Sequence, residues 1–194
     1  MVTCLLLTAG LSGRFGSPKA LALLKQNTVI EHLQNILLQT ACDKIIVVLG
    51  AAASMIEPYL FKHKRIRIVH NKDYDFGQTS SVQTGLRNIG NKTTGIMLLP
   101  VDCPLIRVST FDLLIDHFKK ERPDILIPTC GHQKGHPPIF HVRLKPEILD
   151  LPLNAGINSL FMTHLPHTLE IDDPGINKTF NTREEFKTIV SFPD

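Results

Sequence analysis

Residues 5–19 read Leu5-Leu6-Leu7-Thr8-Ala9-Gly10-Leu11-Ser12-Gly13-Arg14-Phe15-Gly16-Ser17-Pro18-Lys19, an apolar run that turns abruptly into glycines, hydroxyls and two cations. A run of this kind, without polar alternation, is typical of a strand that helices cover on both faces in a parallel sheet. Gly10, Gly13 and Gly16 allow positive φ angles and a close approach of backbone N–H groups to an anion. The stretch therefore predicts a strand that delivers a phosphate-binding loop.

The two cations of this loop suit the same purpose. Arg14 offers a forked donor and Lys19 a point charge for phosphate oxygens. Neither common glycine fingerprint fits, because the glycine spacing from Gly10 is wrong for the Rossmann pattern G-x-G-x-x-G and no G-K-[ST] follows as a Walker loop requires. Taken alone, the stretch is also compatible with an ordinary strand-to-helix turn that carries surface cations.

Apolar runs alternate with segments of helical spacing along the rest of the chain. Further strands are expected at 44–50, 66–69, 96–101, 125–127, 139–140 and 168–171. Helices are expected at 28–39, 51–61, 80–88, 109–121, 144–149, 158–164 and 182–190. For the first of these helices, Thr28 is placed as the N-cap and Glu31 as its capping-box partner. This alternation favours βαβ units, so we expect the α/β class: a three-layer α/β/α, Rossmann-like sandwich with a mostly parallel sheet, in one domain over 1–194.

Length and composition limit the function classes. The chain has 194 residues, a formal charge of +3 and 21 basic against 18 acidic residues. This small excess, without a basic stripe, suits anionic small molecules better than a nucleic acid. Four cysteines lie far apart without a C-x-x-C pair, and no apolar stretch is long enough for a membrane span. We expect free thiols, no nucleic-acid or membrane partner, and a cytoplasmic location.

Two further segments carry polar groups where ligands of α/β proteins bind. Asp102 follows the expected strand at 96–101, and one carboxylate beside a phosphate loop is enough to begin a Mg²⁺ site. An aspartate that caps the next turn is the alternative. Gly77, Ser80 and Ser81 lie at the start of the expected helix at 80–88, where N–H groups and hydroxyls favour an anion, or else simply cap the helix. Cys103 is interpreted as a packing residue, since no histidine near it in sequence would activate a nucleophile.

The segment Leu7–Lys19 closely resembles the L-x-A-G-x-S-x-R-[MF]-G-x-x-K signature of nucleotidylyltransferases, especially molybdenum cofactor cytidylyltransferases. Pro100-Val101-Asp102-Cys103-Pro104 matches the P-V-D-x-P metal motif of that family. Residues 77–86 are similar to its G-x-x-x-S-x-x-x-G-L segment, and residues 131–140 to its G-x-x-G-H-P-x-x-F segment. With weaker matches further on, the resemblance covers nearly the whole chain and implies a fold of the nucleotide-diphospho-sugar transferase type.

The resemblance implies a set of site residues. It assigns nucleotide contacts to Leu7, Thr8, Ala9, Gly10, Ser12, Gly13, Arg14, Lys19, Gly77, Ser80 and Ser81. It implies catalytic roles for Arg14, Lys19 and Asp102, which would neutralise charge as pyrophosphate leaves. His136 lies toward the second substrate, although a lone histidine in a turn is also commonly structural. Alanine at position 9 implies CTP rather than GTP, because family members that transfer guanylate carry glycine there.

The C-terminal match departs from the family pattern. Residues 171–186 resemble D-D-P-G-I-x-x-D-I-D-T-P-E-D-[YL], but the first aspartate of D-I-D-T-P is Thr179, the second is Asn181 and the proline is Arg183. Metal binding is therefore assigned to Asp102 with Asn181, or with a neighbouring oxygen in its place. If neither completes the site, the metal would bind weakly.

The implied activity is transfer of CMP from CTP to the phosphate of molybdopterin or molybdenum cofactor, with Mg²⁺, or alternatively Mn²⁺, as cofactor. CTP and a pterin phosphate would be the substrates, and a molybdoenzyme or its maturation chaperone a partner. Two alternatives stay open. One is a nucleotidylyltransferase for a sugar or polyol phosphate. The other is a nucleotide-binding protein that has lost catalysis, as Thr179 and Asn181 would allow.

Overall fold

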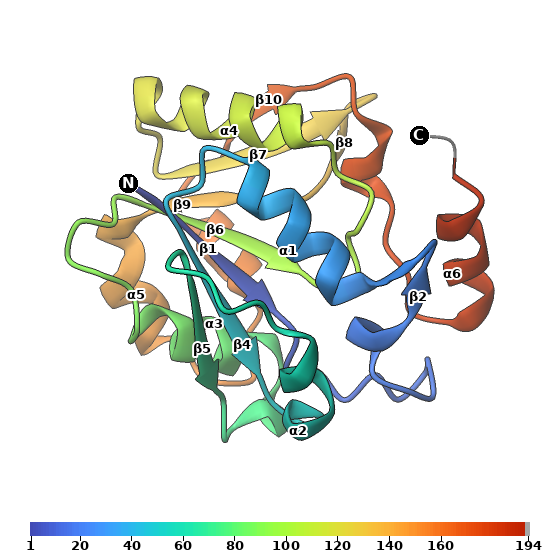
Figure 1. Ribbon diagram of the computed structural model, residues 1–194. Coiled ribbons are helices and arrows are strands. Elements are labelled where there is room, and N and C mark those ends of the chain that lie inside the picture. The colour runs from blue at the N-terminus through green and yellow to red at the C-terminus, as the bar shows by residue number, and fades with distance from the viewer. Residues whose placement is uncertain (193–194) are drawn as a thin grey trace.

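The computed structural model describes residues 1–192 and is built around one twisted sheet of eight strands (Figure 1). The strands of this sheet are β1 (Val2–Leu7), β4 (Lys44–Leu49), β5 (Ile66–His70), β6 (Gly95–Pro100), β7 (Ile125–Cys130), β8 (Gln133–Lys134), β9 (Ile139–His141) and β10 (His167–Glu170). Their order is β10-β7-β9-β6-β1-β4-β5, and β8 pairs with β7. The β1, β4, β5 and β6 neighbours are parallel, as are β7 and β10, whereas β9 runs antiparallel to β6 and β7. The predicted three-layer fold with a mostly parallel mixed sheet is confirmed.

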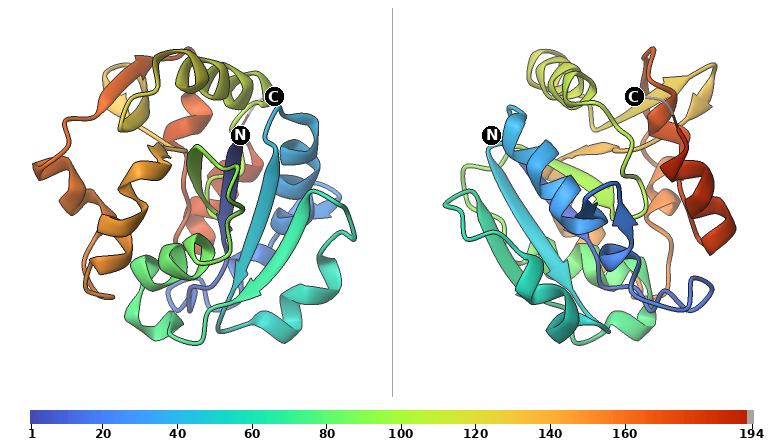
Figure 2. Two further views of the ribbon diagram at one scale, coloured as in Figure 1. Left: turned by 90° about the vertical axis from the view of Figure 1, so that its left-hand side faces the viewer. Right: turned by 45° about the vertical axis from the view of Figure 1, so that its right-hand side comes forward.

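Helices cover both faces of the sheet (Figures 1 and 2). The α-helices are α1 (Val29–Gln39), α2 (Ala53–Ile56), α3 (Gln78–Leu86), α4 (Val108–Glu121), α5 (Lys145–Asp150) and α6 (Arg183–Val190). Short 3₁₀ turns are η1 (Lys19–Leu21), η2 (Glu57–Tyr59), η3 (Tyr74–Phe76), η4 (Val142–Leu144), η5 (Ile157–Met162) and η6 (Pro174–Asn177). Apolar side chains of α1, α4 and α6 pack on one face, and those of α3 and α5 pack on the other.

Strand β1 lies inside the sheet between β6 and β4, which explains the unbroken apolar run at its end, Cys4–Leu7. All six of its residues are buried. Cys4 and Leu6 belong to the core under α1 and α4, whereas Leu5 and Leu7 belong to the core under α3 and α5. Full burial of each leucine contributes about 1.5–3 kcal/mol. A strand that supplies both cores can carry no polar side chain at these positions.

Local differences from the expected elements have local causes. The helix expected at 51–61 is only α2, followed by η2, because Pro58 has no N–H group and cannot continue the hydrogen-bond ladder. The expected helix at 158–164 is instead the 3₁₀ turn η5. Two hairpins were not predicted. One joins β2 (Leu23–Leu24) to β3 (Asn27–Thr28) through a turn in which Lys25 has a φ of 56°, and the other joins β7 to β8.

The residues that the structure describes contain no helix long and apolar enough to cross a membrane. The four cysteines lie within these residues and are free thiols, as expected.

The capping box predicted at the start of α1 is confirmed. The backbone N–H of Glu31 donates to the Thr28 hydroxyl at 3.4 Å, and the backbone N–H of Thr28 donates to the Glu31 carboxylate at 2.9 Å. The Thr28 hydroxyl also donates to the Glu31 carboxylate at 2.6 Å, and this bond, together with that from the Thr28 N–H, lowers the pKa of Glu31. The box fixes the start of the helix that covers β1.

Replacing Thr28 with Ala should lower the free energy of unfolding by about 1 kcal/mol, because an N–H group at the start of α1 loses its acceptor. Thr28→Ser keeps the acceptor and is the matched control. Urea denaturation followed by circular dichroism measures both variants. Equal stability of Thr28→Ala and Thr28→Ser would show that the cap contributes nothing.

Candidate active site

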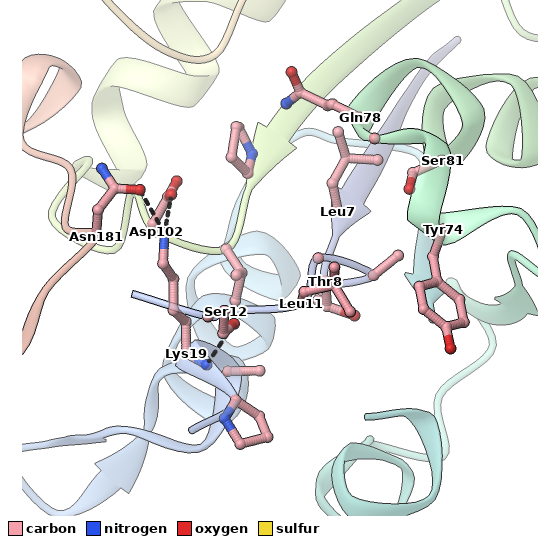
Figure 3. A pocket seen from close by; sticks show the side chains of 18 of the residues that line it. Leu7, Thr8, Leu11, Ser12, Lys19, Tyr74, Gln78, Ser81, Asp102 and Asn181 are labelled. Atoms are coloured by element: carbon pink, nitrogen blue, oxygen red, sulfur yellow. Dashed lines mark hydrogen bonds and ion pairs between the residues drawn. The ribbon is translucent and has the colours of Figure 1, made fainter. Parts of the chain in front are cut away.

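A pocket of about 340 Å³ opens at the carboxyl ends of β1 and β6 (Figure 3). These two strands are parallel neighbours, and Leu7 of β1 lies opposite Pro100 of β6. The loop after β1 and the turn after β6 therefore leave the sheet side by side. The N-terminus of α3 and Asn181 complete the wall. Carboxyl ends of parallel strands are the usual ligand site of open α/β sheets.

The loop after β1 has a conformation suited to exposing backbone donors. Ser12 has a φ of 53° and Gly16 a φ of 78°. The Ser12 carbonyl accepts the N–H groups of Phe15 at 3.0 Å and Gly16 at 3.1 Å. The Ser12 hydroxyl accepts the N–H of Lys19 at 3.2 Å, which ties the beginning of the loop to its end. Gly10 and Gly13 line the pocket and are exposed, so their backbone can approach a ligand closely.

Three polar side chains meet at one end of the pocket (Figure 3). The Lys19 ammonium group donates to Asp102 Oδ2 at 2.8 Å and to Asn181 Oδ1 at 2.9 Å. Arg14 donates to the same Asn181 oxygen at 3.1 Å. The Lys19 and Asp102 side chains are only 13% and 22% exposed, so their attraction is screened less than that of a surface ion pair. Segments more than 80 residues apart in sequence thus form one charged cluster.

Position 181, rather than 179, faces this cluster. Asn181 lines the pocket and binds both cations, whereas Thr179 is exposed and is not among the lining residues. The family motif aligns its second metal ligand with Thr179, where this chain has no carboxylate, and the ligand expected from the sequence is Asn181 or a neighbouring oxygen. The structure brings the amide oxygen of Asn181 to the side of Asp102.

Asp102 and Asn181 are the residues that could hold a divalent metal here. Their oxygens already converge on one cation, the Lys19 ammonium, and carboxylate and amide oxygens are hard ligands that suit Mg²⁺ or Mn²⁺. Among residues 1–192, no group of three or more His, Cys, Asp or Glu side chains could hold a metal. A metal at this position would therefore need phosphate oxygens or water to complete its coordination.

The opposite end of the pocket is less charged. Tyr74 and Ser81 lie there, across from Lys19 and Asp102 (Figure 3). The buried amide of Asn71 holds this wall in place, since it donates to the Ser80 hydroxyl at 2.8 Å and the Ser81 hydroxyl at 3.0 Å. Ala9 packs against the backbone of Gly50, where an added Cβ would lie 2.7 Å from the Ala9 Cβ and 2.8 Å from the Tyr74 Cβ. This end is closely packed.

Two of the expected contacts do not line the pocket. Ser80 is buried, and its hydroxyl donates to the Gly77 carbonyl at 2.8 Å, so it shapes the turn into α3. His136 lies outside the lining residues, and burial lowers the pKa of its imidazole while the Asp102 charge opposes this shift. Its Nδ1 is buried without a hydrogen-bond partner. The remaining predicted residues line the pocket: Leu7, Thr8, Ala9, Gly10, Ser12, Gly13, Arg14, Lys19, Gly77, Ser81, Asp102 and Asn181.

Tyr74 and Asn71 are site residues that sequence reasoning did not find. Tyr74 lies just before residues 77–86, which match the family pattern. A single aromatic residue in a loop does not by itself indicate a binding site. Asn71 could have been suspected as a polar residue two positions after the expected strand at 66–69, and in the structure it directly follows β5. Its importance lies in being buried, which a single sequence does not reveal.

Cys103 is a packing residue next to the charged cluster. Its Sγ donates to Asp102 Oδ1 at 3.6 Å. Burial and the neighbouring carboxylate both raise the pKa of this thiol, so it stays protonated and is a poor nucleophile at neutral pH.

Comparison with known proteins identifies the family. The profile of the MobA-like NTP transferase domain matches residues 4–168. The chain belongs to this family. It is a nucleotidyltransferase, and its pocket is lined by Gly10, Gly13, Arg14 and Lys19 of the segment after β1.

Relatives of this nucleotidyltransferase span most of its length. The molybdenum cofactor cytidylyltransferase of Escherichia coli K12 is 23% identical over 187 residues, covering 96% of this chain and 94% of the relative. The nicotine blue oxidoreductase of Paenarthrobacter nicotinovorans is 28% identical over 190 residues, covering 89% and 86%. The crystal structure of Rv0371c from Mycobacterium tuberculosis H37Rv has a TM-score of 0.86 at 23% identity, covering 98% of both chains. Its manganese complex has a TM-score of 0.81 at 22% identity, with the same coverage.

Proposed function

We propose that this chain transfers CMP from CTP to the phosphate of molybdopterin or molybdenum cofactor and releases pyrophosphate. The observation that carries the proposal is the cluster in which Lys19 joins Asp102 and Asn181 beside the glycine-rich loop. A triphosphate is bound by backbone N–H donors and cations that lie close together, with a carboxylate nearby that can hold a metal. The likeness to the cytidylyltransferase of E. coli over nearly the whole chain supports the choice of substrates.

The two ends of the pocket suit the two parts of a nucleotide. The loop Gly10–Pro18, with Arg14 and Lys19, receives the triphosphate. The closely packed end formed by Ala9, Tyr74 and Ser81 receives the base and ribose. This orientation directs the α-phosphate toward Asp102, which lies in the turn after β6 and is bonded to Lys19 of the loop.

In the proposed reaction, an oxygen of the acceptor phosphate attacks the α-phosphorus in line. A new P–O bond forms while the bond from the α-phosphorus to the bridging oxygen breaks, and the electron pair leaves with pyrophosphate. Arg14 and Lys19 neutralise the charge that develops on the leaving group. Because phosphoryl transfer asks for little covalent help, positioning and charge account for most of the catalysis.

Asp102 and Asn181 would hold a divalent metal, either Mg²⁺ or Mn²⁺. When bound, the metal would supply Lewis-acid charge next to the phosphate oxygens. The manganese complex of the structurally similar Rv0371c supports a divalent ion in this fold. Lys19 now binds Asp102 Oδ2 and Asn181 Oδ1, so we expect its ammonium group to move toward a phosphate oxygen when a metal and a nucleotide bind.

The acceptor enters on the side of His136. Burial lowers the pKa of this imidazole, against the opposing effect of the Asp102 charge, so the ring is neutral at neutral pH. Its Nδ1 is buried without a hydrogen-bond partner, so an acceptor would reach this atom only if the surrounding turn shifts. His136 thus shapes the acceptor side without adding a charge.

Release of pyrophosphate tests the proposal against its alternatives. Each common nucleoside triphosphate is incubated with Mg²⁺ and with molybdopterin, a sugar phosphate or a polyol phosphate in turn. Turnover only with CTP and molybdopterin supports the proposal. Turnover with a sugar or polyol phosphate would replace the acceptor, and nucleotide binding without any turnover would indicate a protein that has lost catalysis.

The substitution Asp102→Asn should reduce turnover at least about 100-fold, because a neutral amide is a poor ligand for Mg²⁺. The fold should remain intact, since asparagine can still accept the Lys19 hydrogen bond. Pyrophosphate release measures the loss, and thermal unfolding is the control for stability. Activity close to that of the unchanged protein would remove Asp102 from the mechanism.

The substitution Ala9→Gly should reduce the preference for CTP over GTP, because it removes the methyl group that packs against Gly50 at the base end of the pocket. Isothermal titration with each nucleotide in the presence of Mg²⁺ measures the preference. We expect the unchanged protein to bind CTP more tightly by about tenfold or more, equivalent to about 1.4 kcal/mol. Tighter binding of GTP by the unchanged protein would replace the cytidylyl assignment with a guanylyl one.

The substitution Asn181→Asp should raise metal affinity, because a second carboxylate would join Asp102. Half-saturation of turnover should then occur at a lower Mg²⁺ concentration. The matched control is Thr179→Asp, which adds the same charge at an exposed position two residues away. A larger effect of Thr179→Asp than of Asn181→Asp would mean that the ligand position is 179.

A further inference from the structure

The C-terminal segment Phe180–Phe186 packs directly on the loop after β1, more than 160 residues away in sequence. In the right-hand view of Figure 2, α6 stands beside the N-terminal loop drawn in blue. Most residues of this loop are exposed, including Leu11 at 65%, but Phe15 is only 4% exposed. A loop that buries a single large side chain is anchored at that residue.

Aromatic rings provide this anchor. The Phe15 ring meets the Phe180 ring edge-on, with centroids 5.4 Å apart, and the Phe186 ring at 5.7 Å. The rings of Phe180 and Phe186 are themselves 4.7 Å apart. Edge-to-face pairs at these distances are favourable beyond the apolar area that they bury. The C-terminal segment therefore forms the binding site for Phe15.

Arg183 covers the other side of the anchor. Its guanidinium carbon lies 5.3 Å from the centroid of the Phe15 ring, and its Nη2 donates to the Ser17 hydroxyl at 3.3 Å. The Arg183 side chain is exposed, so its loss removes these contacts without opening the core. We call Phe15, Phe180, Phe186 and Arg183 the aromatic clasp.

The same segment also reaches the cations of the loop. Asn181 accepts hydrogen bonds from Arg14 and Lys19, which stand on either side of Phe15 in the sequence. Lys19 Nζ lies 5.5 Å from the centroid of the Phe180 ring. The anchor and the phosphate-directed cations therefore belong to one set of contacts.

We propose that Arg183 is a positioning residue that holds the loop Gly10–Ser17 in its nucleotide-receiving conformation. It acts through the Phe15 ring and the Ser17 hydroxyl and does not contact the nucleotide. This role of Arg183 rests on the proposed function only in that CTP is taken as the nucleotide. Glycines and positive φ angles make the free loop flexible, so an ordering contact lowers the entropic cost of binding.

This role predicts that the aromatic clasp and a bound nucleotide stabilise each other. If the clasp orders the loop for a nucleotide, a bound nucleotide must stabilise the clasp by the same free energy. Binding of CTP at the N-terminal loop should therefore slow amide hydrogen exchange in α6. Slower exchange in α6 would not require any movement of the strands of the sheet.

The test is hydrogen exchange of the nucleotide-free protein, followed by mass spectrometry of the peptides that cover residues 10–18. Arg183→Met keeps the length of the side chain but removes the charge and the donor. It should raise exchange of these peptides roughly tenfold while β4 stays unchanged. Lys187→Met, one turn further along α6 and also exposed, is the matched control and should leave the loop unchanged. Unchanged exchange in Arg183→Met would overturn the proposal.

Nucleotide titrations separate positioning from direct contact. Arg183→Met should weaken CTP binding by about the same factor, with little change of kcat at saturating CTP. In the double variant Phe15→Leu/Ser17→Ala, the further substitution Arg183→Met should have a much smaller effect, because both groups on which Arg183 acts are gone. Additive effects would show that Arg183 acts on the nucleotide itself. The exchange measurement requires no nucleotide, so it remains decisive even if the protein does not transfer CMP.

Discussion

The ion pair between Lys19 and Asp102, shared with Asn181, is the interaction on which the site depends. It joins the loop after β1, the turn after β6 and the segment before α6 at a single ammonium group. Partial burial strengthens this attraction, but it also makes an unpaired charge costly at this position. The three segments must therefore come together for any one of them to be stable in its observed place. The proposed triphosphate chemistry and the stability of the local structure would therefore rest on the same contacts.

The sheet makes this meeting possible. Strand β1 supplies leucines to both cores, and its parallel pairing with β6 brings Leu7 next to Pro100. Thr8 and Asp102 are thereby delivered to the same edge of the sheet. The buried Asn71 network fixes the start of α3 on the far side of the pocket. Hydrophobic burial thus sets the position of the polar groups, and hydrogen bonds set their orientation.

Features that depend on local sequence were predictable. The apolar run of β1, the glycines of the loop and the capping box of Thr28 and Glu31 each follow from neighbouring residues. Features created by long-range packing were not. The hydrogen bonds that Arg14 and Lys19 donate to Asn181 depend on how the segment before α6 turns, and the anchor role of Phe15 depends on Phe180 and Phe186. The position of Tyr74 in the pocket wall and the burial of Asn71 also depend on the folded structure.

Under the proposed function, Asp102 and Asn181 form one cation position, which Lys19 occupies until a metal–nucleotide complex arrives. A crystal structure with Mn²⁺ and a non-hydrolysable CTP analogue would decide this, because anomalous scattering locates the manganese. We expect manganese bound to oxygens of Asp102, Asn181 and the triphosphate, with Lys19 Nζ moved to a phosphate oxygen. Manganese at another position, with the ion pair between Lys19 and Asp102 intact, would contradict it.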